Sequence, residues 1–298
     1  MRTDSGTPAL SVLVAAHNAR STISACLRSL EAQRTSAPFE IIVADSSSDG
    51  TDNLVAQGFP GVRLIHSDER MYCGEARNLA LSQAHGEIIA FIDADCTVPP
   101  DWAELVLAAH RGPQAAIGGA IANGNPESLV GWAAYLCEFS QWLPGTPVGP
   151  MADIAGASMT YKKAILSQCG PFIQGTYGSD TEFHWRLACQ GIRPLFEPSI
   201  VVFHHSIREL RAFLRHELQH GRCFARVRVR HKGLPDAHRL TYALCWPLIA
   251  FRLLAAVCWR CRRSPRHAAH LLACLPLLAL GLIAWSCGEA WGYLEETS

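Results

Sequence analysis

The feature that most constrains the fold is an alternation of short apolar runs with segments of helical period in the N-terminal part of the chain. The segment Gly74 to Ala84 has a helical period and stops before Gly86. Such alternation is typical of a parallel sheet covered by helices. We therefore expect an α/β fold with a Rossmann-like, mostly parallel sheet and flanking helices. The first predicted strands are Leu10 to Ala15, Glu40 to Ala44, Val62 to His66 and Glu87 to Ile92.

Further along the chain the pattern becomes less regular. The segment Gly118 to Pro150 is rich in Gly, Pro, Asn and Trp, so we expect irregular structure or short strands there. After it we predict a strand at Ala157 to Tyr161, a helix from Lys162, a helix at Asp180 to Gln190, a short strand at Ile200 to Phe203 and a long basic helix at Ser206 to Arg230.

Composition excludes some classes of function. The chain has 298 residues, 49% of them hydrophobic, which suffices for one sizeable core and a smaller appended element. Lys plus Arg and Asp plus Glu number 26 each, so no overall charge indicates nucleic-acid binding. The twelve cysteines show no paired spacing, and we expect reduced thiols in a cytoplasmic setting. The N-terminus, Met1 to Pro8, lacks an export signal pattern, so we expect no export.

Two apolar segments near the C-terminus, Leu240 to Trp259 and Ala268 to Cys287, approach the roughly 20-residue length that crosses a bilayer. Pro247 and Arg252 make the first a poor spanning helix. We expect the first to lie in the membrane interface and the second to insert deeply or to span. The basic helix before them suits attraction to anionic lipid on the cytoplasmic face. The alternative is that both are core helices of a soluble accessory domain.

Acidic residues follow several of the predicted strands. Asp93 and Asp95 end a buried strand, and ligands of open α/β sheets bind at the carboxyl ends of strands. Such a pair can hold a divalent cation together with phosphate oxygens, although a turn or cap explains a lone pair equally well. Asp45 to Thr51 follows the second strand, and Asp180 to Glu182 starts a helix. Arg77, in the first turn of its helix, can face either a phosphate or solvent.

In this order these segments resemble the family 2 glycosyltransferases of GT-A fold. The resemblance runs from about Leu10 to Arg230. Its most specific parts are Ser11 to Asn18, Asp45 to Thr51, Arg77 to Ala80, Ala90 to Asp95, and Asp180 to Glu182 with Arg186.

The resemblance implies roles on the nucleotide side of the site. The backbone of Ala15 and the side chain of His17 would border the nucleotide base. Asp45 would accept a hydrogen bond from the base, although family members often have one more residue in that loop. Arg77 would lie on the phosphate side. From family habit the donor is a uridine-type nucleotide diphosphate sugar.

The resemblance also implies a metal centre and a base. Asp93 would face the ribose or the metal, and Asp95 would bind an Mg²⁺ or Mn²⁺ ion, with His204 near the metal or the diphosphate. Asp180 would be the general base, and the expected outcome is inversion at the anomeric carbon. Ser179 stands where the family usually carries a Glu.

The sequence further favours a single transfer onto a glycan or lipid-linked acceptor of polysaccharide biosynthesis. Processive relatives carry Gln-x-x-Arg-Trp where this chain has Gln219 to Cys223, so Cys223 replaces the Trp. We predict a catalytic domain at 1–205, a basic juxtamembrane helix at 206–239 and a membrane-associated tail at 240–298.

Two other functions stay open. A nucleotidyltransferase that makes sugar nucleotides would require a Gly-rich loop after the first strand, but His17 to Arg20 contains no glycine. The other is a non-catalytic sugar-nucleotide-binding membrane scaffold, in which the acids would be expendable.

Overall fold

The computed structural model describes residues 7–262 and 264–295. The chain divides into two compact units. The first, which we call the α/β unit, comprises 7–122, 146–175 and 179–204, and the second, the helical unit, comprises 123–145, 176–178, 205–262 and 264–295. The predicted three-part division at 205 and 239 stays a prediction.

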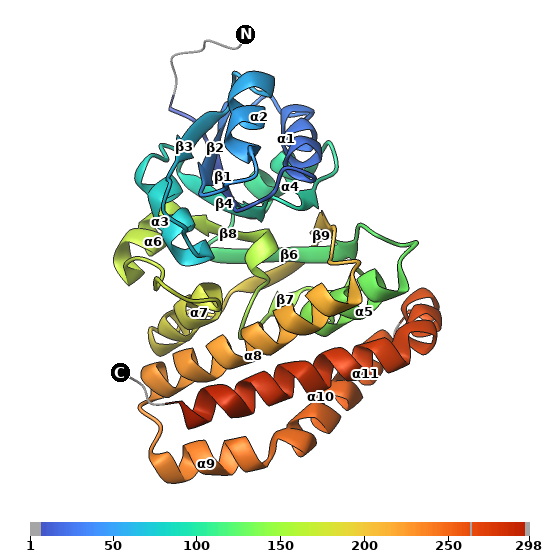
Figure 1. Ribbon diagram of the computed structural model, residues 1–298. Coiled ribbons are helices and arrows are strands. Elements are labelled where there is room, and N and C mark those ends of the chain that lie inside the picture. The colour runs from blue at the N-terminus through green and yellow to red at the C-terminus, as the bar shows by residue number, and fades with distance from the viewer. Residues whose placement is uncertain (1–6, 263, 296–298) are drawn as a thin grey trace. The chain divides into compact units, whose positions relative to one another are not determined.

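Four parallel strands form one half of the sheet in the α/β unit (Figure 1). Their order is β3 (Arg63–His66), β2 (Phe39–Asp45), β1 (Leu10–Ala16) and β4 (Ile88–Asp93). In this register Ala15 lies opposite Ala44 on one side and Asp93 on the other. The central strands β1 and β2 are almost entirely buried, as continuous apolar runs in a helix-covered parallel sheet should be. The predicted α/β fold class is confirmed.

The other half of the sheet is antiparallel. Beyond β4 the order continues β8 (Met159–Lys162), β6 (Ala116–Asn123), β9 (Leu195–His204) and β5 (Cys96–Thr97), while β7 (Gly149–Pro150) pairs with β9. Cys96 of β5 lies opposite His204 of β9. The sheet is therefore mixed, and its antiparallel half brings the end of β9 to the segment that follows β4.

Helices and a 3₁₀ turn complete the α/β unit. One buried cluster combines residues of α3, α6 and α7 with residues of β1, β2, β4 and β8, so these helices share a core with the sheet. Helix α1 contacts α2 and β5, and α4 contacts β9. The bounds are α1 (Ile23–Glu31), α2 (Thr51–Gly58), α3 (Cys73–Ser82), α4 (Trp102–Ala109), η1 (Gly156–Ser158), α6 (Lys163–Cys169) and α7 (Ser179–Cys189).

The segment Gly118 to Pro150 is more regular than predicted. It contains most of β6 and an 11-residue helix, α5 (Leu129–Phe139), which begins where the Ser128 hydroxyl accepts a hydrogen bond from Gly131 N. Strand β9 is also longer than the predicted Ile200 to Phe203, although it contains Pro198, which cannot donate to the ladder. In both places strand pairing or burial outweighs the tendency of Gly and Pro to interrupt regular structure.

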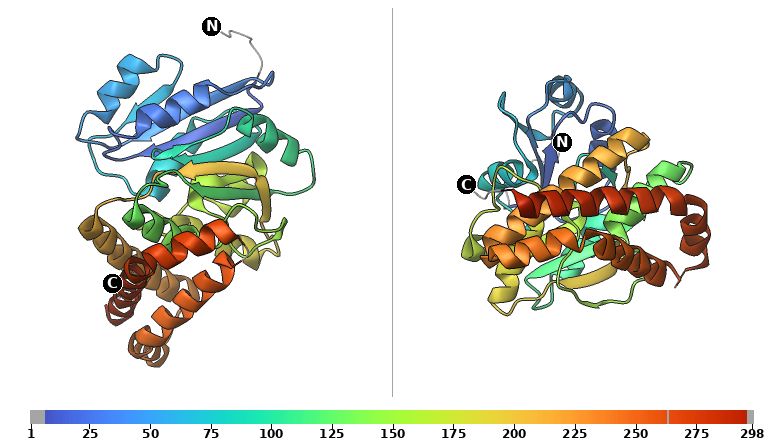
Figure 2. Two further views of the ribbon diagram at one scale, coloured as in Figure 1. Left: turned by 90° about the vertical axis from the view of Figure 1, so that its right-hand side faces the viewer. Right: turned by 60° about the horizontal axis from the view of Figure 1, so that its bottom comes forward.

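The helical unit consists of α5 and four further helices. They are α8 (Leu210–Lys232), α9 (Asp236–Leu244), α10 (Trp246–Cys261) and α11 (Pro265–Leu294). Helix α11 runs alongside α8 and also contacts α5, α9 and α10 (Figures 1 and 2). Gly221 of α8 and Gly288 of α11 each lie so close to the partner helix that a Cβ would be 1.9 Å from a backbone oxygen. Glycines thus allow the two backbones to approach closely.

One described helix, α11, is long and apolar enough to cross a membrane by length and composition. The predicted segment Ala268 to Cys287 lies within it, whereas Leu240 to Trp259 is divided between α9 and α10, which are bent by 64°. Pro247 stands in the first turn of α10, where a missing N–H is tolerated.

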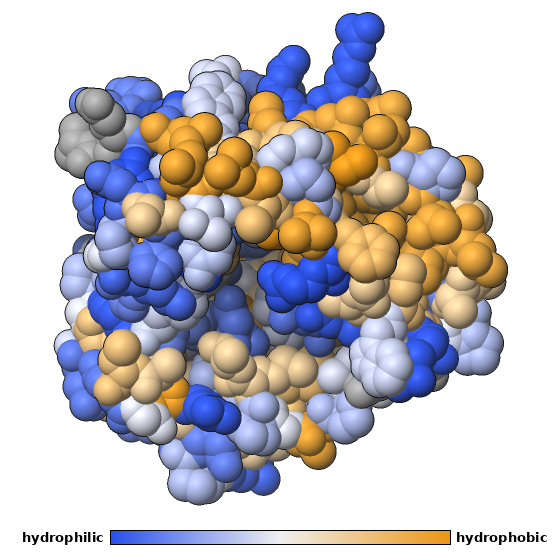
Figure 3. Space-filling model, turned by 90° about the horizontal axis from the view of Figure 1, so that it is seen from below, coloured by the Kyte–Doolittle hydropathy of each residue, from blue (hydrophilic) through white to orange (hydrophobic). Residues whose placement is uncertain are grey.

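Large apolar side chains are exposed on these helices. Figure 3 looks onto the molecule from below and shows apolar residues gathered over a broad part of that face, bordered by hydrophilic ones. The most exposed are Leu244, Leu248, Phe251, Trp259, Leu272 and Leu294, with 58–73% of their surface accessible. A contiguous apolar surface of this kind marks a place where a protein contacts a partner or a membrane.

The expectation of reduced thiols in a cytoplasmic setting stays a prediction. All twelve lie within the described residues and all are free.

Candidate active site

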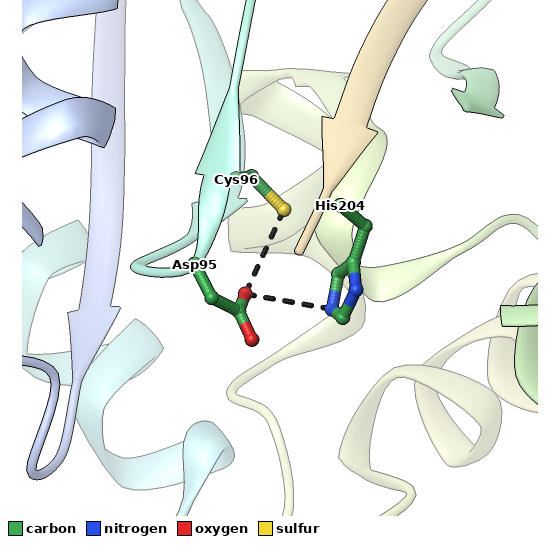
Figure 4. A group of neighbouring side chains, drawn as sticks. All are labelled: Asp95, Cys96 and His204. Atoms are coloured by element: carbon green, nitrogen blue, oxygen red, sulfur yellow. Dashed lines mark hydrogen bonds and ion pairs between the residues drawn. The ribbon is translucent and has the colours of Figure 1, made fainter. Parts of the chain in front are cut away.

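The two acids that follow β4 lie beside the end of β9. Asp93 is the last residue of β4, and a turn through Asp95 leads directly into β5. Because β5 and β9 pair antiparallel, His204 comes to the same edge, with its Nε2 atom 3.4 Å from Asp95 Oδ1 (Figure 4). Cys96 Sγ lies 3.8 Å from the same oxygen. Two residues predicted to contact a metal are therefore neighbours, although they are far apart in the sequence.

Arg77 organises the buried side of this edge. Only 5% of its side chain is exposed, and its Nη2 atom lies 3.5 Å from Asp93 Oδ1 and 3.4 Å from the carbonyl oxygen of Gly156. Its Nη1 atom donates to Ser179 Oγ at 3.3 Å. Burial raises the pKa of Asp93, the charge of Arg77 opposes this shift, and the charge of Asp95 adds to it. Arg77 thus holds Asp93 and the start of α7 together from within the unit.

Asp180, in the first turn of α7, lies at the same edge of the sheet. A Cβ added to Gly156 would be 2.6 Å from Asp180 Oδ2 and 2.8 Å from Arg77 Nη2. The carboxylate therefore lies against the backbone of η1 and beside the guanidinium. Arg77 Nη2 contacts Asp93 as well, so the guanidinium lies beside both acids, and the charge of Asp180 contributes to the raised pKa of Asp93. Asp93, Asp95 and Asp180 converge on one edge of the α/β unit.

A buried network that the sequence did not reveal supports α7. His184 lies one turn after Asp180, is fully buried and forms an ion pair with Asp153 through Nδ1. Its Nε2 atom is hydrogen-bonded to the Tyr161 hydroxyl at 2.7 Å. Thr181 Oγ1 donates to Asp153 Oδ2 at 3.3 Å. In the sequence, only the spacing of His184 from Asp180, one helical turn apart, could have indicated this role. That signal is weak, because the partners of His184 come from distant segments of the chain.

His17 follows β1 and Asp45 is the last residue of the adjacent β2, but their environments differ. His17 is exposed, and its Nδ1 atom donates to the Ser46 carbonyl oxygen at 2.8 Å. Asp45 is fully buried and accepts hydrogen bonds from Ser47 Oγ and, at 2.7 Å, from His66 Nδ1. This bond to Asp45 raises the pKa of His66. The predicted contacts of Ala15, His17 and Asp45 with a nucleotide base stay predictions.

A family model now decides the classification. The model described as Glycosyl transferase family 2 matches residues 11–163. The chain belongs to this family. The matched residues contain nearly all of β1 to β4 together with Asp93 and Asp95, whereas Asp180 to Glu182, which also carried the sequence resemblance, lie beyond them.

Comparisons with individual relatives agree with the family assignment. The chain is 30% identical over 102 residues to the glycosyltransferase AglE of Haloferax volcanii, a match that covers 33% of this chain and 34% of AglE. The matches to the most similar curated relatives span about a third of the length of those proteins.

Solved structures of the same fold cover almost the whole family 2 chain. The mannosyltransferase PcManGT from Pyrobaculum calidifontis, in complex with GDP-Man and Mn²⁺, superposes with a TM-score of 0.62 at 19% identity and covers 96% of this chain and 88% of that one. S. aureus TarS in complex with UDP-GlcNAc superposes with a TM-score of 0.53 at 16% identity, over 94% and 90% of the two chains.

The segment Gln219 to Cys223 lies in α8 of the helical unit. Gln219 Nε2 donates to Cys223 Sγ at 3.5 Å. Arg222 forms an ion pair with Glu295 and lies over the ring of Trp291, 4.3 Å from its centroid. The arginine of this segment therefore ties α8 to the end of α11.

Proposed function

We propose that the chain is an inverting, metal-dependent glycosyltransferase that moves a sugar from a nucleotide diphosphate donor onto an acceptor hydroxyl. The observation that carries the proposal is the convergence of the Asp95–His204 pair, the Arg77–Asp93 pair and Asp180 on one edge of the sheet. Each feature alone has a structural explanation. Together they supply a cation site and a carboxylate base next to each other.

The residues at this edge fit a divalent cation. Asp95 offers a carboxylate with 39% of its side chain exposed, and the His204 imidazole lies 3.4 Å away. Carboxylate oxygens suit both Mg²⁺ and Mn²⁺, and the imidazole nitrogen favours Mn²⁺ of the two. Held by Asp95 and His204, such a cation would neutralise the charge that develops on the leaving nucleoside diphosphate.

Asp180 is the proposed base. Its carboxylate takes the proton of the acceptor hydroxyl while that oxygen forms a bond to the anomeric carbon of the donor. The bond from the anomeric carbon to the diphosphate oxygen breaks on the opposite face, which inverts the configuration. Asp153, His184 and Tyr161 keep the first turns of α7 in position for this proton transfer.

We propose a uridine-type donor and a glycan or lipid-linked acceptor. Related structures support a nucleotide sugar as the class of ligand, because one holds GDP-Man and another UDP-GlcNAc. The base and the sugar are open to direct measurement with a panel of donors.

The site would work at the cytoplasmic face of a membrane. Along α11 the side turned to α8 carries polar contacts, with Arg228 donating to Tyr293 Oη at 2.8 Å and lying 3.7 Å from Glu289. A helix that spanned the bilayer in this arrangement would bring the arginines of α8 into hydrocarbon, at a cost of about 2.5 to 3.5 kcal/mol each. We therefore propose that α9, α10 and α11 lie in the membrane plane with their exposed apolar side chains in the lipid.

The decisive experiment compares wild-type protein with Asp95→Asn and Asp180→Asn in vesicles, with a panel of nucleotide sugars, lipid-linked acceptors and Mn²⁺. We expect nucleoside diphosphate release to fall by at least about a hundred-fold in both variants. Asp101→Asn, an exposed aspartate of the same unit, is the matched control.

The products separate the alternatives. A nucleotidyltransferase would produce pyrophosphate in place of nucleoside diphosphate, and a scaffold would bind donor without turnover. Equal turnover by wild type and both variants would contradict the assignment of these acids. Chelation by EDTA, followed by addition of Mn²⁺, should abolish and restore the activity.

A further inference from the structure

A second cluster of metal-ligating side chains lies in the helical unit, separate from the residues of the proposed active site. Glu138 stands near the end of α5, and His216 and Glu217 are neighbours in α8. One ligand atom from each of the three lies within 4.8 Å of the other two. The cluster therefore joins two helices that are distant in the sequence.

The distances in this cluster match those between the ligands of a bound ion. His216 Nε2 lies 3.4 Å from Glu138 Oε1, and Cys137 Sγ lies 3.3 Å from Glu217 Oε2. Four ligands in a tetrahedron around zinc, with bonds of about 2.1 Å, are about 3.4 Å apart from one another. Two of the separations in the cluster therefore already have the length expected between zinc ligands.

The burial of Glu217 provides an independent reason for a cation. Only 1% of this residue is exposed, and among the residues that the structure describes no donor reaches its Oε1 atom. No arginine or lysine in the described ranges pairs with it either. A buried carboxylate without a compensating charge is costly. A divalent cation would supply that charge for Glu217.

The surrounding aromatic rings favour a defined geometry. His216 and His220 have ring centroids 4.1 Å apart, and the ring of Tyr177 lies 4.7 Å from that of His220. Burial lowers the pKa of His220 to about 4, so this ring contributes no positive charge near neutral pH. These contacts restrict the orientation of His216, as outer partners do at metal sites.

We propose that Glu138, His216 and Glu217 form a zinc site that links α5 to α8. Cys137 is the nearest side chain for a fourth ligand, since its sulfur lies beside Glu217. Oxygen, nitrogen and sulfur donors in one small, partly buried site suit zinc better than Mg²⁺ or Mn²⁺. The role is structural, because the ion would connect two helices of one unit.

The test is a zinc titration of the full-length protein in detergent without nucleotide, after treatment with a chelator and exchange into metal-free buffer. We expect wild type to bind one equivalent of zinc with a rise in melting temperature. Glu217→Gln and His216→Ala should weaken this binding by more than about a hundred-fold. Glu127→Gln and His238→Ala change exposed residues of the same unit and should bind zinc as wild type does.

A second measurement requires no variant at these ligands to fold. Co²⁺ added to the metal-free wild type should give the visible absorption of a tetrahedral site, and zinc should remove it. Asp95→Asn should keep this site, which separates it from the cation site proposed for catalysis. Absence of a stoichiometric zinc site in wild type would overturn the proposal, and so would equal zinc affinity in a folded Glu217→Gln or His216→Ala variant.

Discussion

The two units of the chain bury their apolar residues in different ways. In the α/β unit the apolar residues of β1, β2 and β4 lie inside, and polar side chains gather where the strands end. In the helical unit α9, α10 and α11 expose many large apolar side chains in addition to those they bury. The α/β unit therefore leaves few large apolar side chains exposed. The helical unit exposes an apolar surface that suits contact with a partner or a membrane.

Two glycines, one from each unit, illustrate different uses of a close approach. Gly156 of the α/β unit leaves room for two side chains of the proposed active site, Asp180 and Arg77. Gly288 of the helical unit leaves room for the backbone of another helix, at Leu218. Loss of Gly156 should therefore affect chemistry, whereas loss of Gly288 should affect stability.

The largest expected effect concerns the exposed apolar surface. Replacing Leu244 and Phe251, which are 71% and 72% exposed, by Glu should weaken binding to anionic vesicles by about 4 kcal/mol, or roughly a thousand-fold. Vesicle sedimentation measures this loss, and circular dichroism should show an unchanged helix content. Val148→Glu, at an exposed apolar position of the α/β unit, is the matched control. Equal loss in the control would mean that the helical unit is not the membrane surface.

The next effect concerns the crossing of α8 and α11. In Gly288→Ala the new Cβ would be 1.9 Å from the carbonyl oxygen of Leu218, so the helices must separate, at a cost of about 3 kcal/mol. Thermal and denaturant unfolding measure this loss. Gly58→Ala, in open space at the end of α2, should leave stability unchanged or raise it. If both variants unfold like wild type, the close contact is absent.

A smaller effect concerns acid stability of the α/β unit. Burial lowers the pKa of His110 from 6.5 to about 4, and its Nε2 atom is hydrogen-bonded to Thr160 Oγ1 at 2.7 Å. Between these pH values His110 is protonated in the unfolded chain but neutral in the folded chain. The free energy of unfolding therefore decreases as the pH falls. The loss from His110 between about pH 8 and about pH 5 should be about 2 kcal/mol. Denaturant unfolding of wild type and His110→Gln at both pH values measures it, and identical pH dependence would contradict the assignment.

The smallest effect rests on the proposed catalytic role. Gly156→Ala should displace Asp180 or Arg77 and lower kcat about tenfold, while donor affinity and melting temperature change little. Gly149→Ala, where a Cβ meets no atom within 4 Å, should retain wild-type kcat. A wild-type kcat in Gly156→Ala would show that the carboxylate does not depend on this close approach.

Much of the α/β unit could be predicted because its signals are local. Continuous apolar runs identified β1, β2 and β4, and the acids directly after β4 had to lie at the carboxyl edge of a parallel sheet. Helix α5 was missed for two reasons. The Gly, Pro and Asn residues around it indicated irregular structure, and the helix is buried on most of its faces, so its sequence shows no clear apolar and polar sides. The single apolar segment predicted at Leu240 to Trp259 is two helices, a division that depends on how they pack.

The sequence by itself determined β1 to β4, the long helix α8 and the positions of Asp93, Asp95 and Asp180 near the ends of elements, because periodicity and turn chemistry depend on neighbouring residues. Only the tertiary structure decided that the His204 ring lies against Asp95, that Gly156 lies against Asp180 and that Glu138 comes near Glu217. These contacts depend on strand register and helix packing. Both are set by the burial of the whole unit, which no short stretch of sequence contains.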